Sequence, residues 1–258
     1  MRSFPRALCA LVLACACTTA AFATTVLPVD APQAVDRAEL IFVGTVVHLE
    51  TATTGDGLLP YTFVTFAVDE ALKGRAADAE LTLRFEGGDL PEQQETVEVV
   101  GMPSFELGDE AVLFVAGNGE AACPLVGWWQ GELSIVRHPA TGERLLLDHR
   151  GAPIEGVSAD GWRVGPVHYD AAEQRFVDST ADGVELLWQD GVEIVDEPSI
   201  ERAGAYEGVG ADSVLDALRQ LVSERQERKS FTRGDVVRSA DPADLPYSVT
   251  FLPVAPTE

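Results

Sequence analysis

Cysteine is scarce in this chain and unevenly placed. Three of the four cysteines lie within the first 17 residues, and only Cys123 follows. If that N-terminal stretch is removed, no internal disulfide can form and the fold must rest on burial alone. A chain of 258 residues is long enough for this. Because Cys123 has apolar neighbours, we predict a buried, unreactive thiol rather than a nucleophile.

Basic residues are also few. Eighteen Lys and Arg oppose 42 Asp and Glu, which gives a formal net charge of −24. Such a charge repels nucleic acid and anionic lipid surfaces, so neither is an expected partner. The acidic residues are spread over both halves of the chain, which is typical of a solvated acidic surface.

Long apolar runs are missing as well. No segment reaches the roughly 18 apolar residues that a transmembrane helix needs, so an integral membrane protein is not expected. The N-terminal run, 7–16, is preceded by Arg2 and Arg6 and followed by small residues that end at Ala23. This order is typical of a secretory signal peptide, 1–23, cleaved after Ala23.

An alternative interpretation of the N-terminus is a lipoprotein signal. The segment 12–15 loosely resembles a lipobox and would make Cys15 the lipidated first residue. Both interpretations predict a periplasmic or secreted protein. Removal of residues 1–23 would make the net charge two units more negative.

Residues 24–150 predict a small antiparallel barrel of the OB type. Short β-rich segments alternate with turn signals, and little helix lies between them. Asp30 and Pro32 predict a short capped helix before the first strand, and Gly44 predicts a bulge within that strand. The expected strands are 40–47, 61–68, 80–85, 96–100, 111–115, 133–136 and 144–147. Phe105 and Leu107 are expected to tuck under the sheet.

The remainder is less regular. Residues 151–230 predict short strands at 161–164, 175–177 and 184–188, which would pack on the barrel, and an amphipathic helix at about 212–228. The prolines of 231–258 indicate an extended tail that is disordered in part.

The order of several blocks resembles a known group of proteins. The blocks are 38–46 with its VGTV segment, 61–64 followed by Lys73-Gly74, and 103–114 with its GDEAVLF segment. They resemble uncharacterised exported bacterial proteins and, more remotely, the netrin-like domain of tissue inhibitors of metalloproteases. The resemblance covers about 30–137 and implies an OB-type barrel. It further implies an inhibitor or accessory factor of a secreted metalloprotease.

Known chemical motifs are absent from the sequence, so no cofactor and no metal is expected. His138 and His149 flank a hairpin loop and could approach each other across it, although exposed histidines are the more ordinary outcome. A second set of possible ligands, near Gly183, is more typical of a solvated acidic turn. That set is Asp178, Asp182 and Glu185.

The pair Trp128-Trp129 is the feature that suggests a contact surface. If the pair lies on a strand, one indole enters the core and the other points outward, where it would contact a sugar or a protein. The alternative is that Leu186, Trp188 or the C-terminal helix covers the outward indole. We therefore expect an exported, non-catalytic binding protein whose partner is another exported or envelope protein.

Two other classes of function stay open. One is the metalloprotease inhibitor that the resemblance implies. The other is an enzyme with an unrecognised carboxylate site, for which four acidic residues near turns are available. These are Glu86, Asp89, Asp109 and Glu110.

Overall fold

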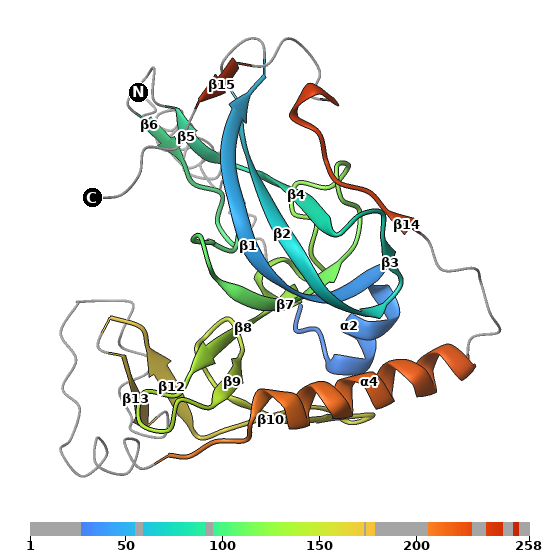
Figure 1. Ribbon diagram of the computed structural model, residues 1–258, viewed down its shortest axis with the longest axis vertical. Coiled ribbons are helices and arrows are strands. Elements are labelled where there is room, and N and C mark those ends of the chain that lie inside the picture. Colours follow the sequence, from blue (N-terminus) through green and yellow to red (C-terminus); the bar gives the residue numbers. More distant parts are fainter. Residues whose placement is uncertain are drawn as a thin grey trace, which may run out of the picture.

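The fold is built on one antiparallel sheet. The computed structural model describes residues 27–54, 59–90, 95–172, 174–178, 206–228, 236–244 and 250–252. Six strands follow one another in the order β4-β2-β1-β7-β8-β9, and β15 adds to β1 (Figure 1). Their bounds are β1 Leu40–Thr53, β2 Pro60–Lys73, β4 Glu80–Glu86, β7 Glu110–Val115, β8 Glu132–Arg137, β9 Arg144–Leu147 and β15 Thr250–Leu252. The expectation of a mainly β fold with one amphipathic helix near its C-terminus is confirmed.

Strands β1 and β2 are long and curve around a core on one side of the sheet (Figure 1). Their register shifts between Val43 and Gly44, which confirms the expected bulge. A side chain at Gly44 would lie 2.6 Å from the Ala67 carbonyl oxygen, so the close approach requires glycine. The core on this side contains Phe42, Phe66, Leu83, Phe85, Leu113 and Cys123, with Phe105 packed against it. Burial of Cys123 confirms the prediction made for it.

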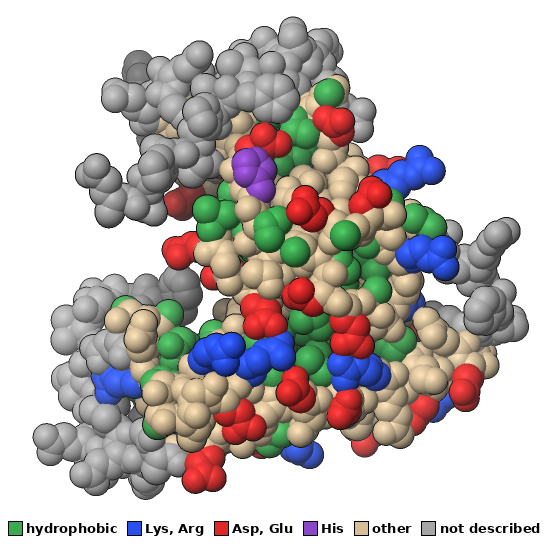
Figure 2. Space-filling model, in the orientation of Figure 1, with side chains coloured by type: hydrophobic (Ala, Val, Ile, Leu, Met, Phe, Trp, Pro, Cys, Tyr) green, Lys and Arg blue, Asp and Glu red, His purple; other side chains and the backbone are tan. Residues whose placement is uncertain are grey.

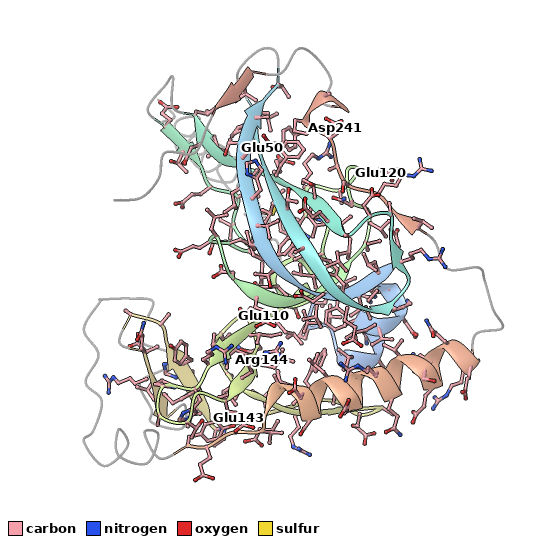
Figure 3. The ribbon with its side chains drawn as sticks, in the orientation of Figure 1. Glu50, Glu110, Glu120, Glu143, Arg144 and Asp241 are labelled. Carbon is pink, nitrogen blue, oxygen red and sulfur yellow. The ribbon has the colours of Figure 1, made fainter. Side chains whose placement is uncertain are left out.

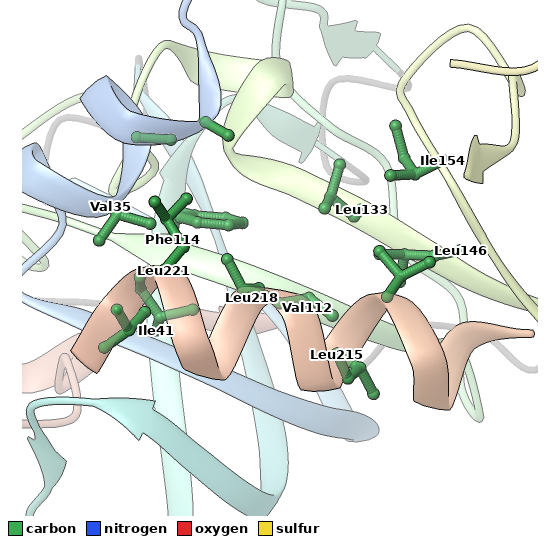
Figure 4. Close-up of a cluster of buried hydrophobic side chains, with 14 of the residues drawn as sticks. Val35, Ile41, Val112, Phe114, Leu133, Leu146, Ile154, Leu215, Leu218 and Leu221 are labelled. Atoms are coloured by element: carbon green, nitrogen blue, oxygen red, sulfur yellow. The ribbon is translucent and has the colours of Figure 1, made fainter. Parts of the chain in front are cut away.

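The opposite face of the sheet is covered by two helices and a hairpin. The helices are α2 (Ala31–Arg37) and α4 (Ala211–Arg228), and the hairpin pairs β10 (Ile154–Ser158) with β11 (Gly161–Val164). Asp30 caps α2 by accepting from the Gln33 amide, as expected. The apolar stripe of α4 lies against the sheet (Figure 4) and includes Leu215, Leu218 and Leu221. The expected helix at 212–228 is therefore confirmed.

Arginines join α4 to the elements beneath it. Figure 2 shows basic side chains in a band between acidic ones where α4 meets the sheet. Arg219 donates to both carboxylate oxygens of Glu70 on β2, at 2.8 and 2.6 Å. Arg144 on β9 pairs with Glu110 on β7, close to the N-terminus of α4 (Figure 3).

Smaller paired units surround the sheet. They are β5 (Gly88–Leu90) with β6 (Glu95–Val97), β12 (Val167–Asp170) with β13 (Arg175–Asp178), and β3 (Arg75–Ala76) with β14 (Val236–Val237). The short helices are η1 (Trp128–Gly131) and η2 (Pro242–Asp244). The strand expected at 96–100 ends at Val97, and Val100 is 92% exposed. The expected strand at 184–188 lies outside the described residues.

Two short segments of the region expected to be an extended tail pair with strands of the fold. β15 pairs with the end of β1, and β14 runs parallel to β3.

Both outer strands of the main sheet have covered edges. Along β4, the Thr82 amide donates to the Ser239 hydroxyl at 3.0 Å, and the Thr82 carbonyl accepts from the Ala240 amide at 2.9 Å. Along β9, Leu145 and Leu147 form single bridges to Gly210 and Pro153. Within the described ranges no pairing joins β4 to β9, so the sheet stays open where the sequence predicted a closed or nearly closed barrel.

One side chain that we expected beneath the sheet lies outside it. Phe105 packs edge-on against Phe66, as predicted. Leu107 is 68% exposed. The Asp109 carboxylate accepts from the Glu106 amide at 2.6 Å and closes a tight turn, so Leu107 stands at the corner and faces solvent.

Candidate functional site: an aromatic groove beside β8

A groove of about 370 Å³ opens between the N-terminal segment, η1, the β8–β9 hairpin and β11. Its apolar wall includes Val29, Leu133 and Val164, and two indoles from distant parts of the chain, Trp129 and Trp162, complete it. Trp162 is fixed by an edge-on contact with Phe114 of the core, at 5.9 Å between ring centroids. The groove therefore has an aromatic wall, part of which is packed on the core.

The tandem tryptophans lie on a 3-10 turn and not on a strand. Trp128 has φ of 61°, a left-handed conformation, and follows Gly127 with φ of 69°. The turn separates the two indoles. Trp128 packs against the core inside the curved sheet, whereas Trp129 lines the groove on the other side. The strand argument made from the sequence was therefore wrong in its geometry, although the indoles do diverge.

Two glycines allow the chain to approach the groove wall. Gly101 has φ of 90°, and a Cβ there would lie 2.1 Å from Cζ3 of Trp129. A Cβ on Gly127 would lie 2.7 Å from Cγ2 of Val29. Any larger residue at either position would displace a lining side chain, so both glycines set the position of the groove wall.

His149 supplies a titratable group to the groove. Its ring centroid lies 6.0 Å from that of Trp129. Packing beside the indole removes water from the ring and lowers the pKa of His149 below its ordinary value. Asp148 opposes this effect and Arg150 adds to it. The imidazole is therefore neutral at neutral pH.

The other polar side chains of the groove are already engaged within the chain. The Gln130 amide accepts from the Val29 amide at 2.9 Å and donates to the Leu27 carbonyl at 3.2 Å. The Asp148 carboxylate accepts from the backbone amides of Arg150 and Ala152, at 2.8 and 3.0 Å. It also accepts from the Arg150 guanidinium, at 2.9 and 3.1 Å.

The structure does not bring together the acidic residues suggested for catalysis. None of Glu86, Asp89, Asp109 and Glu110 lines the groove. Asp89 accepts from the Thr96 hydroxyl at 2.8 Å, Asp109 holds the turn described above, and Glu110 pairs with Arg144.

The two histidines suggested as metal ligands lie at opposite ends of the β8–β9 hairpin. His138 is buried at the turn, where its Nδ1 accepts from the Ala140 and Thr141 amides. Its Nε2 therefore carries the proton and donates to the Tyr206 carbonyl at 2.5 Å. His149 lies beyond the other end of β9. Of the residues that the structure describes, no three acidic, histidine or cysteine side chains form a group that could hold a metal.

The second acidic set proposed as ligands falls mostly outside the description. Asp178 ends β13, and nothing is described of its side chain. Asp182 and Glu185 lie outside the described residues, as does Ala23.

Sequence reasoning missed Glu132. This carboxyl group lies on β8, where it accepts from the Ser134 hydroxyl at 2.7 Å. Partial burial raises the pKa of Glu132, and repulsion from Asp109 adds to the effect. No local signal marks it, because the alternation of β8 places Leu133 and Ile135 inward and predicts a solvated Glu132. Its strand is covered on both faces. Glu132 does not line the groove.

A second cavity, of about 380 Å³, lies where the β14 segment crosses the loop after β7. Arg84 and Arg238 line it together with Glu39, Glu120 and Asp241. Its charges are mixed, and Asn118 inside it is bonded to Thr82 and Arg238. The cavity thus favours no one class of ligand.

Comparisons of this chain with protein-family models, with curated proteins and with solved structures found no match. Among the helices that the structure describes, none is long and apolar enough to cross a membrane.

Proposed function

We propose that this chain is an exported, non-catalytic binding protein and that the groove formed by Trp129, Trp162 and His149 is its binding site. The observation that carries the proposal is the presence of two indoles, those of Trp129 and Trp162, in one open groove. Aromatic side chains of this kind supply most of the binding free energy in interfaces because they bury a large area at little entropic cost.

The hydrogen bonds of the groove support binding over catalysis. A general acid or base must reach substrate with a free carboxyl or imidazole group. The Asp148 carboxylate accepts hydrogen bonds from backbone amides of its own loop. Among the described residues, none forms a hydrogen bond that would orient the His149 imidazole. The groove therefore offers contact area, the His149 imidazole and two indole N–H groups, but no hydrogen-bonded carboxyl–imidazole pair among its described side chains.

The proposal is tested by removing the indole that faces the groove. Trp129→Ala is expected to abolish binding of the native partner in a titration calorimeter, whereas Leu107→Ala, an exposed apolar residue outside the groove, leaves it unchanged. Equal binding by both variants would contradict the proposed site. Circular dichroism and thermal melting of each variant establish that the fold is intact.

Export is tested separately. N-terminal sequencing of the protein recovered from outside the cytoplasm is expected to begin at Thr24. A first residue at Met1, or a lipidated Cys15, would contradict cleavage after Ala23.

A further inference from the structure

The groove contains few free hydrogen-bonding groups. The side chains of Gln130 and Asp148 already form hydrogen bonds with backbone groups of the chain, and Asp148 also bonds to Arg150. Among the described groove side chains, the His149 imidazole and the indole N–H groups of Trp129 and Trp162 make no hydrogen bond to the chain. A sugar needs a partner for almost every hydroxyl that it buries, because an unsatisfied polar group is costly. The groove therefore fits a largely apolar group that makes few hydrogen bonds, to the imidazole or to the indole N–H groups.

The rim extends this apolar character beyond the groove. Leu27 is 76% exposed beside Gln130, and Val164, itself a lining residue, is 38% exposed. Val100 is exposed next to Gly101, the glycine against which Trp129 packs. Isolated exposed apolar residues are ordinary, but three around one aromatic groove form an interaction surface. An apolar rim around an aromatic groove suits the surface of a protein.

Charge favours a basic partner. Arg150 is neutralised by Asp148, so the groove itself carries little charge. Near the end formed by Val29 and Trp162 lie two exposed acidic residues: Asp30, which follows Val29, and Asp160, two residues before Trp162. They are brought close because a Cβ on Gly161 would lie 3.8 Å from the Asp30 Cβ. The net charge of −24 adds a long-range field of the same sign.

We infer that the groove binds an apolar anchor side chain presented by a basic segment of another protein, with the anchor between Trp129 and Trp162 and the flanking cations beside Asp30 and Asp160. This inference rests on the proposed function and names the class of partner. Opposite charges speed the encounter, and the buried anchor holds the complex together.

The test uses ligands selected from random peptides. A displayed library of 12-residue peptides is first depleted on the Trp129→Ala variant and then selected on the wild-type protein. An array of oligosaccharides is probed in parallel. Synthetic copies of the selected peptides are measured by titration calorimetry.

The expected peptides carry a Leu, Ile, Phe or Trp flanked by Lys or Arg. Replacement of that anchor by Ala is expected to weaken binding at least tenfold, and Trp129→Ala in the protein to do the same. Asp160→Lys is expected to weaken binding severalfold at low salt, with the difference reduced at high salt. Val164→Lys, at an exposed lining position, gives a second groove variant if Trp129→Ala does not fold.

Two results would overturn the inference in distinguishable ways. Acidic peptides, or oligosaccharides whose binding is lost in the groove variants, would contradict a basic protein partner while leaving the groove as a binding site. If nothing selected from either collection depends on Trp129 or Val164, both the inference and the proposed function fail.

Discussion

The Lys73 ammonium group donates a hydrogen bond of 2.7 Å to the carbonyl oxygen of Val35. It also donates to the Ala38 carbonyl, so the last residue of β2 closes the C-terminal end of α2. The carbonyl groups at a helix end have no partner within the helix, and a cation there is favoured by the helix dipole. The next residue, Gly74, has φ of 73° and passes close to the Glu39 carbonyl. The Lys73-Gly74 block is thus structural.

Replacement of Lys73 by Met should destabilise the protein by about 1–3 kcal/mol, because buried carbonyl groups lose a charged donor. Urea unfolding followed by circular dichroism measures the change. Arg75→Met removes the same charge from an exposed position two residues away and should cost much less. Equal losses would show that net charge, and not the contact with α2, is responsible.

Adjacent positions on α4 should respond very differently. Leu218 is fully buried, and Leu218→Ala is expected to cost about 2–5 kcal/mol of unfolding free energy. Arg219→Ala removes a bidentate ion pair with Glu70 that is open to solvent, and should cost about 1 kcal/mol or less. Only the second loss should shrink in high salt. If the two losses proved similar, the helix would not be held mainly by its apolar face.

Glu132→Gln should stabilise the protein at neutral pH. Because the pKa of Glu132 is raised in the folded state, the folded protein holds this proton more tightly than the unfolded chain does. That contribution to stability is present at acid pH, below the ordinary range of glutamate, and is lost as pH rises through the raised pKa. Glutamine keeps a neutral group beside Ser134 at every pH.

The gain should be largest above the raised pKa of Glu132, where the wild-type carboxyl group is charged in the folded protein. Melting temperatures measured from pH 4 to pH 8 should diverge as pH rises. Glu143→Gln, at an exposed site, is the control and should show no such divergence. A constant difference between wild type and Glu132→Gln would contradict the raised pKa.

Protonation of His149 should be visible in tryptophan fluorescence, because an imidazolium group quenches a neighbouring indole. The pKa of His149 is lowered, so quenching should begin only below the ordinary histidine range near 6.5. The unfolded chain binds this proton first, so stability from the neutral ring is complete above that range and is lost as pH falls. His149→Gln should remove the transition, and a midpoint above 6.5 in the wild type would contradict the packing described here.

Cys123 should resist alkylation while the protein is folded. Burial raises the pKa of its thiol to about 11, which leaves little thiolate at pH 8. Iodoacetamide treatment followed by peptide mapping should find Cys123 unmodified in buffer and modified in urea. Rapid labelling of the native protein would show that the site opens.

Alternation and capping explain which elements could be predicted from the sequence. Strict period-two alternation in β4 and the apolar stripe of α4 are local signals, and the structure contains both elements at nearly the expected bounds. Asp30 and Gly44 carry signals of the same local kind. Leu107 and the pair at Trp128 were misplaced because single turns decide their direction, and the sequence does not specify the turn type.

The groove could not be predicted, because its walls come from distant parts of the chain. Trp129 precedes β8, His149 follows β9, and Trp162 lies in β11. Only the packing of these elements on the sheet brings them together. Sequence reasoning selected Trp129 but had no means of finding its neighbours, and the same holds for the partial burial of Glu132.

The hydrogen bonds that Ser239 and Ala240 make with Thr82 have a consequence for the molecule as a whole. A chain ending before residue 236 would leave the Thr82 amide of β4 unpaired and its edge uncovered, so that the same strand of a second copy could pair with it. The segment that contains Ser239 and Ala240 thus protects β4 from pairing with a second copy. Its loss would promote aggregation of the protein before it altered the groove.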